Sequence, residues 1–145
     1  MNISTLSPLP PYSAAAFLSV ELLPLVTCRV AAGLPSPAED WLEEKLDLNQ
    51  HLIQHSSATF FVRVEGDSML GAGIHPGDLL IIDRSLKATD GKVILALIDG
   101  EFTVKRLRFN PARLVAENRA FPDLLITEEQ SFEVWGVVTN VIHAL

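Results

Sequence analysis

Apolar residues are concentrated in short runs in the second half of the chain, and turn residues separate these runs. Six segments are rich in Val, Ile, Leu and Phe: 59–64, 78–83, 92–98, 101–109, 113–117 and 132–142. Short runs of β-branched and aromatic residues are typical of strands. The pair Asp99-Gly100 between two of these runs predicts a hairpin, because both central positions of such a turn favour positive φ. We therefore predict a mostly β fold, a compact domain of several antiparallel strands.

The first 37 residues have a different pattern. They contain six of the nine prolines of the chain, and proline fixes φ and donates no backbone hydrogen bond. We predict an extended N-terminal arm here rather than packed secondary structure. A short helix is predicted over 37–48, because Ser36 can cap it, Pro37 suits the first helical position and Glu39 lies three residues after the cap.

Composition indicates a single globular domain and argues against a protein that binds DNA directly. The 145 residues have enough hydrophobic content, 48%, for one domain with a core. The 18 acidic residues outnumber the 11 basic ones, and the net charge is −7. Neutralising phosphates requires clustered Lys and Arg, so we do not expect direct binding to duplex DNA. The single cysteine, Cys28, excludes an internal disulfide, and a reducing cytoplasm is the expected compartment.

We expect neither a membrane anchor nor a secretory signal. No apolar run approaches the roughly 20 residues of a spanning helix. Segment 14–32 is the part most similar to a signal peptide, but no Lys or Arg precedes Arg29, and Glu21 interrupts the apolar stretch. A signal peptide needs a positive region before its apolar core.

The first candidate for a catalytic motif is Gly66-Asp67-Ser68-Met69. A single residue separates it from the apolar run 59–64. A serine on a tight turn at a strand end has an exposed hydroxyl, and neighbouring backbone N–H groups could hold an oxyanion. The commoner role of such a residue is structural, as a serine whose hydroxyl caps the turn.

Lys105 strengthens the catalytic interpretation. Alternation along 101–109 places Thr103, Lys105 and Leu107 on one face of a strand. A lysine between apolar neighbours could be partly buried, which lowers its pKa, and a neutral amine is a general base. A Ser–Lys pair is a known form of the nucleophile and base arrangement. The alternative is a solvated lysine on an edge strand.

Two other sets of residues are weaker candidates. His51 and His55 have the i, i+4 spacing of two metal ligands on one helix, but no third ligand is obvious. Asp67, Asp78 and Asp83 could be catalytic carboxylates, although Asp is common beside Gly and at strand ends for reasons of turn geometry. We expect no metal site, no aspartic dyad and no cofactor.

Three motifs together resemble the LexA/UmuD family of self-cleaving Ser–Lys peptidases, peptidase family S24. They are the segments 66–69, 73–83 and 99–107, which read GDSM, GIHPGDLLIID and DGEFTVKRL. Segments 34–38, 47–50 and 134–138 resemble the UmuD-type subunits of translesion DNA polymerase V rather than the repressors of the family. The resemblance extends from about residue 33 to the C-terminus.

The resemblance implies a role for each motif residue. Ser68 corresponds to the nucleophile and Lys105 to the general base, 37 residues later. The backbone N–H groups of Ser68 and Met69 correspond to the oxyanion site. The scissile bond corresponds to Ala32-Gly33, two small residues that suit a narrow cleft.

The resemblance also implies a division of the chain and a biological role. An arm of residues 1–32 would be removed from a β-rich peptidase and dimerisation domain of residues 33–145. Cleavage would be stimulated by the RecA–single-stranded-DNA filament during the SOS response. The shortened homodimer would then serve as accessory subunit of a UmuC-type Y-family polymerase in the cytoplasm.

Three alternative classes of protein compete with this interpretation. A repressor of the LexA or phage type needs a DNA-binding head, and the 32 residues before the expected cut are Pro-rich with one basic residue, Arg29. A signal peptidase shares the Ser–Lys pair but needs a membrane anchor. A non-catalytic protein-interaction module would keep the fold without using the pair.

Overall fold

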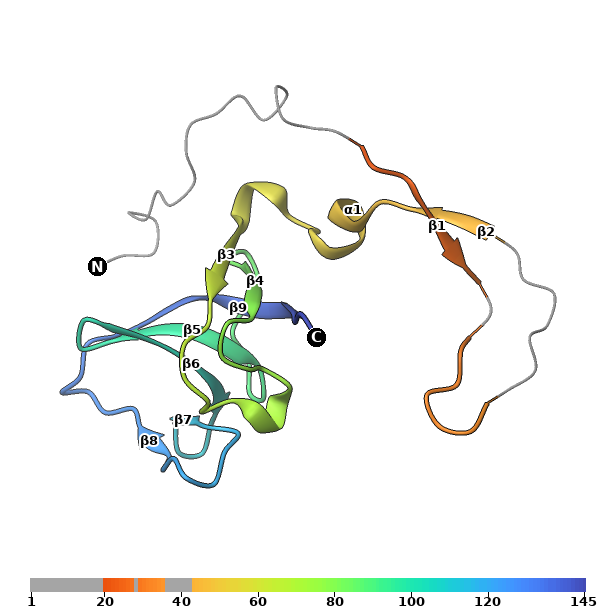
Figure 1. The fold of residues 1–145 in the computed structure, drawn as a ribbon. Helices are drawn as coiled ribbons and strands as arrows, with labels where there is room; N and C mark the ends of the chain where they lie inside the picture. The colour runs from red at the N-terminus through yellow and green to blue at the C-terminus, as the bar shows by residue number, and fades with distance from the viewer. Residues whose placement is uncertain (1–19, 28, 36–42) are drawn as a thin grey trace. The chain divides into compact units, whose positions relative to one another are not determined.

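The computed structural model describes residues 20–27, 29–35 and 43–145 (Figure 1). Their contacts divide the chain into two units. The larger unit holds His55–Leu145, and the smaller holds the described residues up to Gln54. Ser68 and Lys105 both belong to the larger unit.

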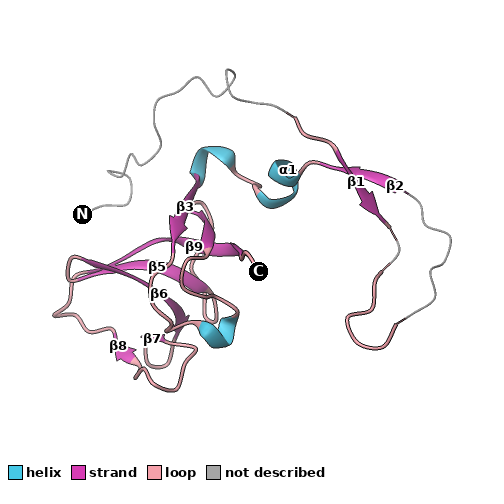
Figure 2. Cartoon of the chain, in the orientation of Figure 1, coloured by secondary structure: helices cyan, strands magenta, loops and turns pink. Residues whose placement is uncertain are grey.

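A seven-stranded antiparallel sheet forms the larger unit, and strands dominate it in Figure 2. The strand order is β3-β4-β9-β5-β6-β7-β8. The strands are β3 (Thr59–Arg63), β4 (Leu79–Asp83), β5 (Val93–Ile98), β6 (Glu101–Arg108), β7 (Arg113–Val115), β8 (Leu124–Leu125) and β9 (Phe132–Ile142). The predicted fold class, mostly β and antiparallel, is confirmed.

All six predicted strands are present, with ends that differ by at most two residues. The hairpin between β5 and β6 is also confirmed, because Asp99 and Gly100 have φ values of 47° and 82°. The two-residue strand β8 was not predicted, since so short a segment has no periodicity. Two 3-10 helices, η3 (Ser56–Ala58) and η4 (Leu70–Ala72), complete the regular elements of this unit.

Strand β9 lies in the centre of the sheet and pairs with both β4 and β5. Two residues of β9 are extra in the register, Thr139 opposite β4 and Trp135 opposite β5. Each extra residue forms a bulge, which locally increases the twist of the sheet.

Successive residues of a strand point to opposite faces, and the core obeys this rule. Leu95 packs in one buried cluster with Phe60, Met69, Ile74, Leu80, Ile82 and Trp135. Its neighbours Ile94 and Ala96 pack in a second cluster with Ile98, Leu107, Leu114 and Val137. The first cluster includes residues of the loop after β3, and it therefore anchors that loop to the sheet.

The smaller unit contains a two-stranded antiparallel sheet of β1 (Leu23–Val26) and β2 (Glu43–Leu46), followed by the helix α1 (Leu48–Leu52). The extended conformation predicted for the arm agrees with β1, but the pairing with β2 was not expected. Pro24 is tolerated in β1 because a two-stranded sheet consists only of edge strands.

The helix predicted over 37–48 is wrong where the structure describes it. Residues 43–46 form β2, and the helix begins only at Leu48. Asp47 caps it, with its Oδ1 accepting a hydrogen bond from the Asn49 N–H at 3.0 Å. The predicted capping residues, Ser36 to Glu39, lie outside the described residues. Over residues 43–46, pairing with β1 takes the place of the predicted helix.

Within the described ranges, every helix is too short or too polar to cross a membrane.

Candidate active site

Ser68 lies in the loop between β3 and β4. The next residue, Met69, is buried, with 3% of its surface exposed, and belongs to the core cluster around Leu95. The 3-10 helix η4 comes next, and Gly73 ends it in the left-handed conformation with φ of 80°. A buried anchor directly after Ser68 and a short helix behind it fix the position of the serine.

A second contact holds the same loop from the segment after β7. The Gly71 N–H donates to the Glu117 carbonyl oxygen at 2.7 Å, and Asn118 Nδ2 donates to the Asp67 carbonyl oxygen at 2.9 Å. A Cβ at position 71 would lie 2.7 Å from the Glu117 carbonyl oxygen, so only glycine permits this approach. Sequence reasoning missed Asn118, since a residue about 50 positions away leaves no local pattern.

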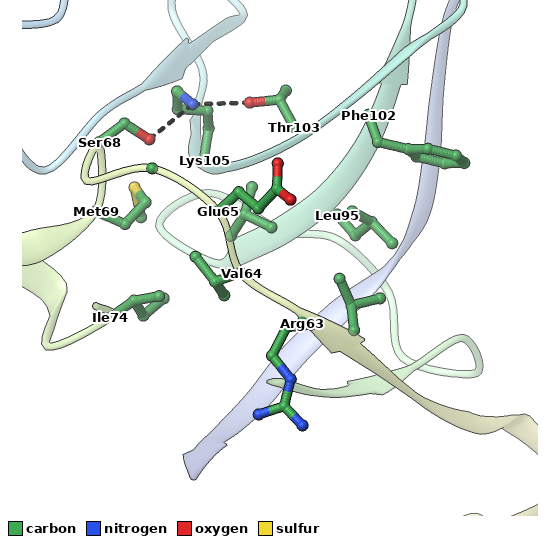
Figure 3. A pocket seen from close by; sticks show the side chains of 13 residues that line it. Arg63, Val64, Glu65, Ser68, Met69, Ile74, Leu95, Phe102, Thr103 and Lys105 are labelled. Atoms are coloured by element: carbon green, nitrogen blue, oxygen red, sulfur yellow. Dashed lines mark hydrogen bonds between the residues drawn. The ribbon is translucent and has the colours of Figure 1, made fainter. Parts of the chain in front are cut away.

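Lys105 extends from β6 toward Ser68 (Figure 3). Its Nζ lies 3.0 Å from Ser68 Oγ and donates to Thr103 Oγ1 at 2.7 Å. Thr103 and Lys105 are two residues apart on one strand, and therefore they point to the same face. The structure thus brings together the two residues expected to be nucleophile and base, with Thr103 beside them.

The environment of Lys105 favours its neutral form. The side chain is half-buried, and β6 is an interior strand between β5 and β7, so Lys105 is not a lysine on a solvated edge. Removal from water disfavours the ammonium and lowers the pKa of Lys105 below its ordinary value. A lysine with a lowered pKa in a cleft is a candidate general base.

Ser68 and Lys105 lie in a cleft of about 340 Å³. One wall comes from β3 and the loop after it, and the other comes from β5 and β6. The lining residues are Val62, Arg63, Val64, Glu65, Gly66, Ser68, Met69, Ile74, Leu95, Phe102, Thr103, Val104 and Lys105. The cleft combines apolar walls with a few polar groups, as sites for small or extended ligands generally do.

The residues expected at the scissile bond, Ala32 and Gly33, belong to the smaller unit. Both are exposed, and the backbone bends there. An exposed, irregular segment is accessible to a peptidase.

The structure does not support the pairing of His51 with His55 on one helix. Helix α1 contains His51 but ends at Leu52. His55 instead contacts Asp83, with 2.6 Å between His55 Nδ1 and Asp83 Oδ2.

The aspartates considered as a catalytic pair are also separated. Asp78 directly precedes β4 and Asp83 is its last residue, about 16 Å away at the usual rise per residue. Both are buried, with 3% exposed. Asp67 is exposed in the loop beside Ser68.

Each buried carboxylate is held ionised by its own partners. Burial alone would raise the pKa of Asp78, but hydrogen bonds from the His75 backbone and from His143, with the charges of both rings, lower it below the ordinary value. Burial likewise opposes ionisation of Asp83, and contacts with Ser85 and His55 lower its pKa. These groups belong to hydrogen-bonded networks away from Ser68.

Comparison with known proteins finds one family model and several similar proteins. The family model described as Peptidase S24-like matches residues 24–139. Protein SamA of Salmonella typhimurium is 50% identical over 121 residues, which cover 83% of this chain and 84% of SamA. Protein MucA of Escherichia coli is 44% identical over 123 residues, covering 83% of this chain and 84% of MucA.

A repressor is among the relatives at lower identity. LexA repressor 1 of Xanthomonas axonopodis pv. citri is 38% identical over 117 residues, which cover 79% of this chain but only 58% of the repressor. The shared part is therefore a portion of that longer protein.

The chain belongs to the peptidase S24-like family, a class of serine peptidases that cleave themselves. Within that class it is a UmuD-like protein of SOS mutagenesis, which confirms the resemblance found in the sequence.

Proposed function

We propose that this protein cleaves its own Ala32-Gly33 bond with Ser68 as nucleophile and Lys105 as general base. The observation that carries the proposal is the 3.0 Å contact between Ser68 Oγ and Lys105 Nζ inside the cleft. The lowered pKa of Lys105 supports it, because only the neutral amine can accept the serine proton.

The orientation of the lysine gives Thr103 a function. Neutral Nζ has two N–H bonds and one lone pair. When one N–H donates to Thr103 Oγ1, the lone pair is free to point toward Ser68. The serine hydroxyl then donates to Nζ, and Thr103 acts as a positioning residue for the base.

Cleavage proceeds by acyl transfer. Nζ takes the Ser68 proton as Oγ attacks the Ala32 carbonyl carbon, and the backbone N–H groups of Ser68 and Met69 stabilise the oxyanion. The C–N bond breaks, the Lys105 ammonium protonates the Gly33 amine, and Ala32 is left as an ester on Ser68. Neutral Lys105 then activates a water molecule that hydrolyses the ester and restores Ser68.

The division of the chain is set by this bond. Residues 1–32 form the removable arm, and residues 33–145 form the peptidase and dimerisation domain. A substrate that belongs to the same chain, or to the other subunit of a dimer, reaches a high effective concentration once it is docked. Control of docking is therefore a sufficient means of control over cleavage.

We further propose the partners that the UmuD-like resemblance implies. The RecA–single-stranded-DNA filament favours the docked state, and the shortened homodimer binds a UmuC-type polymerase subunit in the cytoplasm. The net charge of −7 supports protein partners rather than duplex DNA, because an acidic body repels phosphate.

The test is intact mass spectrometry after incubation with activated RecA filament. The wild-type chain should lose residues 1–32, and Ser68→Ala and Lys105→Ala should each stay intact. Because the two residues act as one unit, the double variant should be no slower than either single one.

Matched controls separate chemistry from folding. Ser57→Ala and Lys87→Ala change the same residue types at exposed positions of the larger unit and should cleave normally. Cleavage of Ser68→Ala at the wild-type rate, with the fold intact by circular dichroism, would show that the nucleophile is misassigned.

A further inference from the structure

A second cluster of polar side chains lies at the end of the sheet, outside the candidate active site. It consists of His75 and Asp78, from the turn before β4, and His143, directly after β9. His143 Nδ1 lies 2.5 Å from Asp78 Oδ1, and His75 Nδ1 lies 3.8 Å from Asp78 Oδ2. The two imidazole rings have their centroids 4.6 Å apart.

A buried carboxylate lies at the centre of this cluster. The Asp78 side chain is 3% exposed, whereas those of His75 and His143 are 47% and 41% exposed. A buried carboxylate is costly unless it is paired with a charge or bound to a metal. The His75 backbone N–H and the two rings already favour the ionised form of Asp78, so a carboxylate ready to bind a cation lies beside two imidazoles that solvent can reach.

The three residues also form a chemically suitable donor set. Each offers one ligand atom, and these atoms all lie within 4.8 Å of one another. Two imidazole nitrogens and one carboxylate oxygen suit Zn²⁺ and related transition metals. Metal–ligand bonds of about 2.1 Å would place the ligand atoms roughly 3.4 Å apart in a tetrahedral site.

We propose that His75, Asp78 and His143 form a binding site for a divalent transition metal ion of the zinc type. The fourth position is open to water. The exposed rings can turn to close the coordination shell while the buried carboxylate stays in place. The backbone N–H of His75 orients that carboxylate through a 2.8 Å hydrogen bond to Asp78 Oδ2, as groups behind a metal ligand commonly do.

The position of the site indicates a structural role. Metal would join the end of β9 to the turn before β4. That turn is hydrogen-bonded to Val64 in both directions, from Gly77 N–H to the Val64 carbonyl and from Val64 N–H to the Asp78 carbonyl. Val64 lines the cleft, so the ion would stabilise the backbone that holds the Ser68 loop in place.

The experiment uses the full chain without a polyhistidine tag, freed of metal with a chelator and titrated with Zn²⁺ by calorimetry. We expect saturable binding of one ion per chain and a higher Tm. In NMR spectra the ring signals of His75 and His143 should shift, and those of His51 should not. Mg²⁺ should give neither binding heat nor a higher Tm, because it prefers oxygen ligands in an octahedral shell.

Variants test the assignment without any assay of self-cleavage. His143→Ala should raise the Kd for Zn²⁺ at least about tenfold, because even mutation of residues that only hydrogen-bond to a metal ligand lowers affinity by that factor. His75→Ala should do the same, and the matched control His51→Ala should bind as wild type. His143 lies after the last strand and is exposed, so its variant keeps the fold testable. Absence of saturable binding, or binding that survives loss of both ring ligands, would overturn the site.

Discussion

At the scale of single residues, the protonation state of Lys105 decides what the cleft can do. Burial lowers the pKa of its ammonium, and in the proposed mechanism the neutral form accepts the Ser68 proton. Spontaneous self-cleavage, without RecA, should therefore rise with pH and level off once Lys105 is deprotonated. The rate of loss of the intact chain, measured by mass spectrometry across a pH series, checks this.

Lys105→Arg is the control for that profile. A guanidinium is not deprotonated in proteins, so this variant should show no cleavage at any pH at which the chain stays folded. A wild-type rate that is flat or falls with pH would contradict a lysine base.

The same burial has a consequence for stability. At pH values between the lowered pKa of Lys105 in the folded chain and its ordinary pKa of about 10.4 in the unfolded chain, the folded chain binds fewer protons at this residue. The free energy of unfolding therefore increases as pH rises through that range. Below it, Lys105 is charged in the folded chain, and burial of that charge destabilises the protein by its full amount. Lys105→Met removes the cost.

We accordingly expect Lys105→Met to raise the Tm at neutral pH, and the gain to shrink as pH approaches about 10.4. Thermal unfolding followed by circular dichroism measures it. Lys87→Met, at an exposed position, should give no such trend. A gain that grows with pH would mean that burial is not what perturbs Lys105.

Residue-level prediction from the sequence succeeded where alternation along a strand was sufficient. The period of two placed Thr103 and Lys105 on one face, and the structure has them hydrogen-bonded. It failed for Asn118, which holds the Ser68 loop from about 50 residues away. A contact of that kind arises from the tertiary fold and leaves no periodic signal.

At the scale of elements, strand β9 permits close packing because of its glycine. A Cβ at Gly136 would lie 2.5 Å from Ile82 Cγ2 and 3.2 Å from the Asp83 carbonyl oxygen, both on β4. Gly136→Ala should therefore lower the free energy of unfolding by about 1–3 kcal/mol, the usual cost of overpacking a core. Urea denaturation in a Ser68→Ala background, where the chain stays intact, measures the loss.

Gly33→Ala is the matched control, since no atom lies within 4 Å of a Cβ at that position. It should leave the denaturation midpoint unchanged. If Gly136→Ala were equally neutral, the β4–β9 contact would be looser than its distances indicate.

Element prediction was reliable for runs long enough to show a period and poor elsewhere. The strands from β3 to β7 and β9 were expected, because their segments are rich in Val, Ile, Leu and Phe. The bulges at Trp135 and Thr139 were not, since a bulge depends on what the partner strands require. The helix expected over 37–48 is wrong over residues 43–46, because β2 pairs there with β1. Its predicted cap lies outside the described residues.

At the scale of the whole molecule, cleavage should shorten the chain without altering its charge. Residues 1–32 contain one acidic residue, Glu21, and one basic residue, Arg29, so the net charge stays at −7. Intact mass and N-terminal sequencing should show a product that starts at Gly33. A product with another N-terminus would place the scissile bond elsewhere.

Because the charge is unchanged, any gain in partner binding must come from surface that the arm leaves. A Ser68→Ala full-length chain and a chain that starts at Gly33 should differ in affinity for the polymerase subunit. Neither should bind duplex DNA at physiological salt. Salt-resistant DNA binding by the short form would contradict this expectation.

The central position of β9 in the sheet also bears on how early during synthesis the chain can cleave itself. Ser68 lies between β3 and β4, whereas Lys105 lies on β6, and β9 is the strand that joins these two parts of the sheet. It is also the last of these strands to be synthesised. A chain still emerging from the ribosome therefore has the proposed nucleophile and base on two strand pairs that β9 does not yet join within one sheet. In the proposed mechanism, self-cleavage therefore requires that the chain be synthesised through β9, and a shorter nascent chain does not cleave itself.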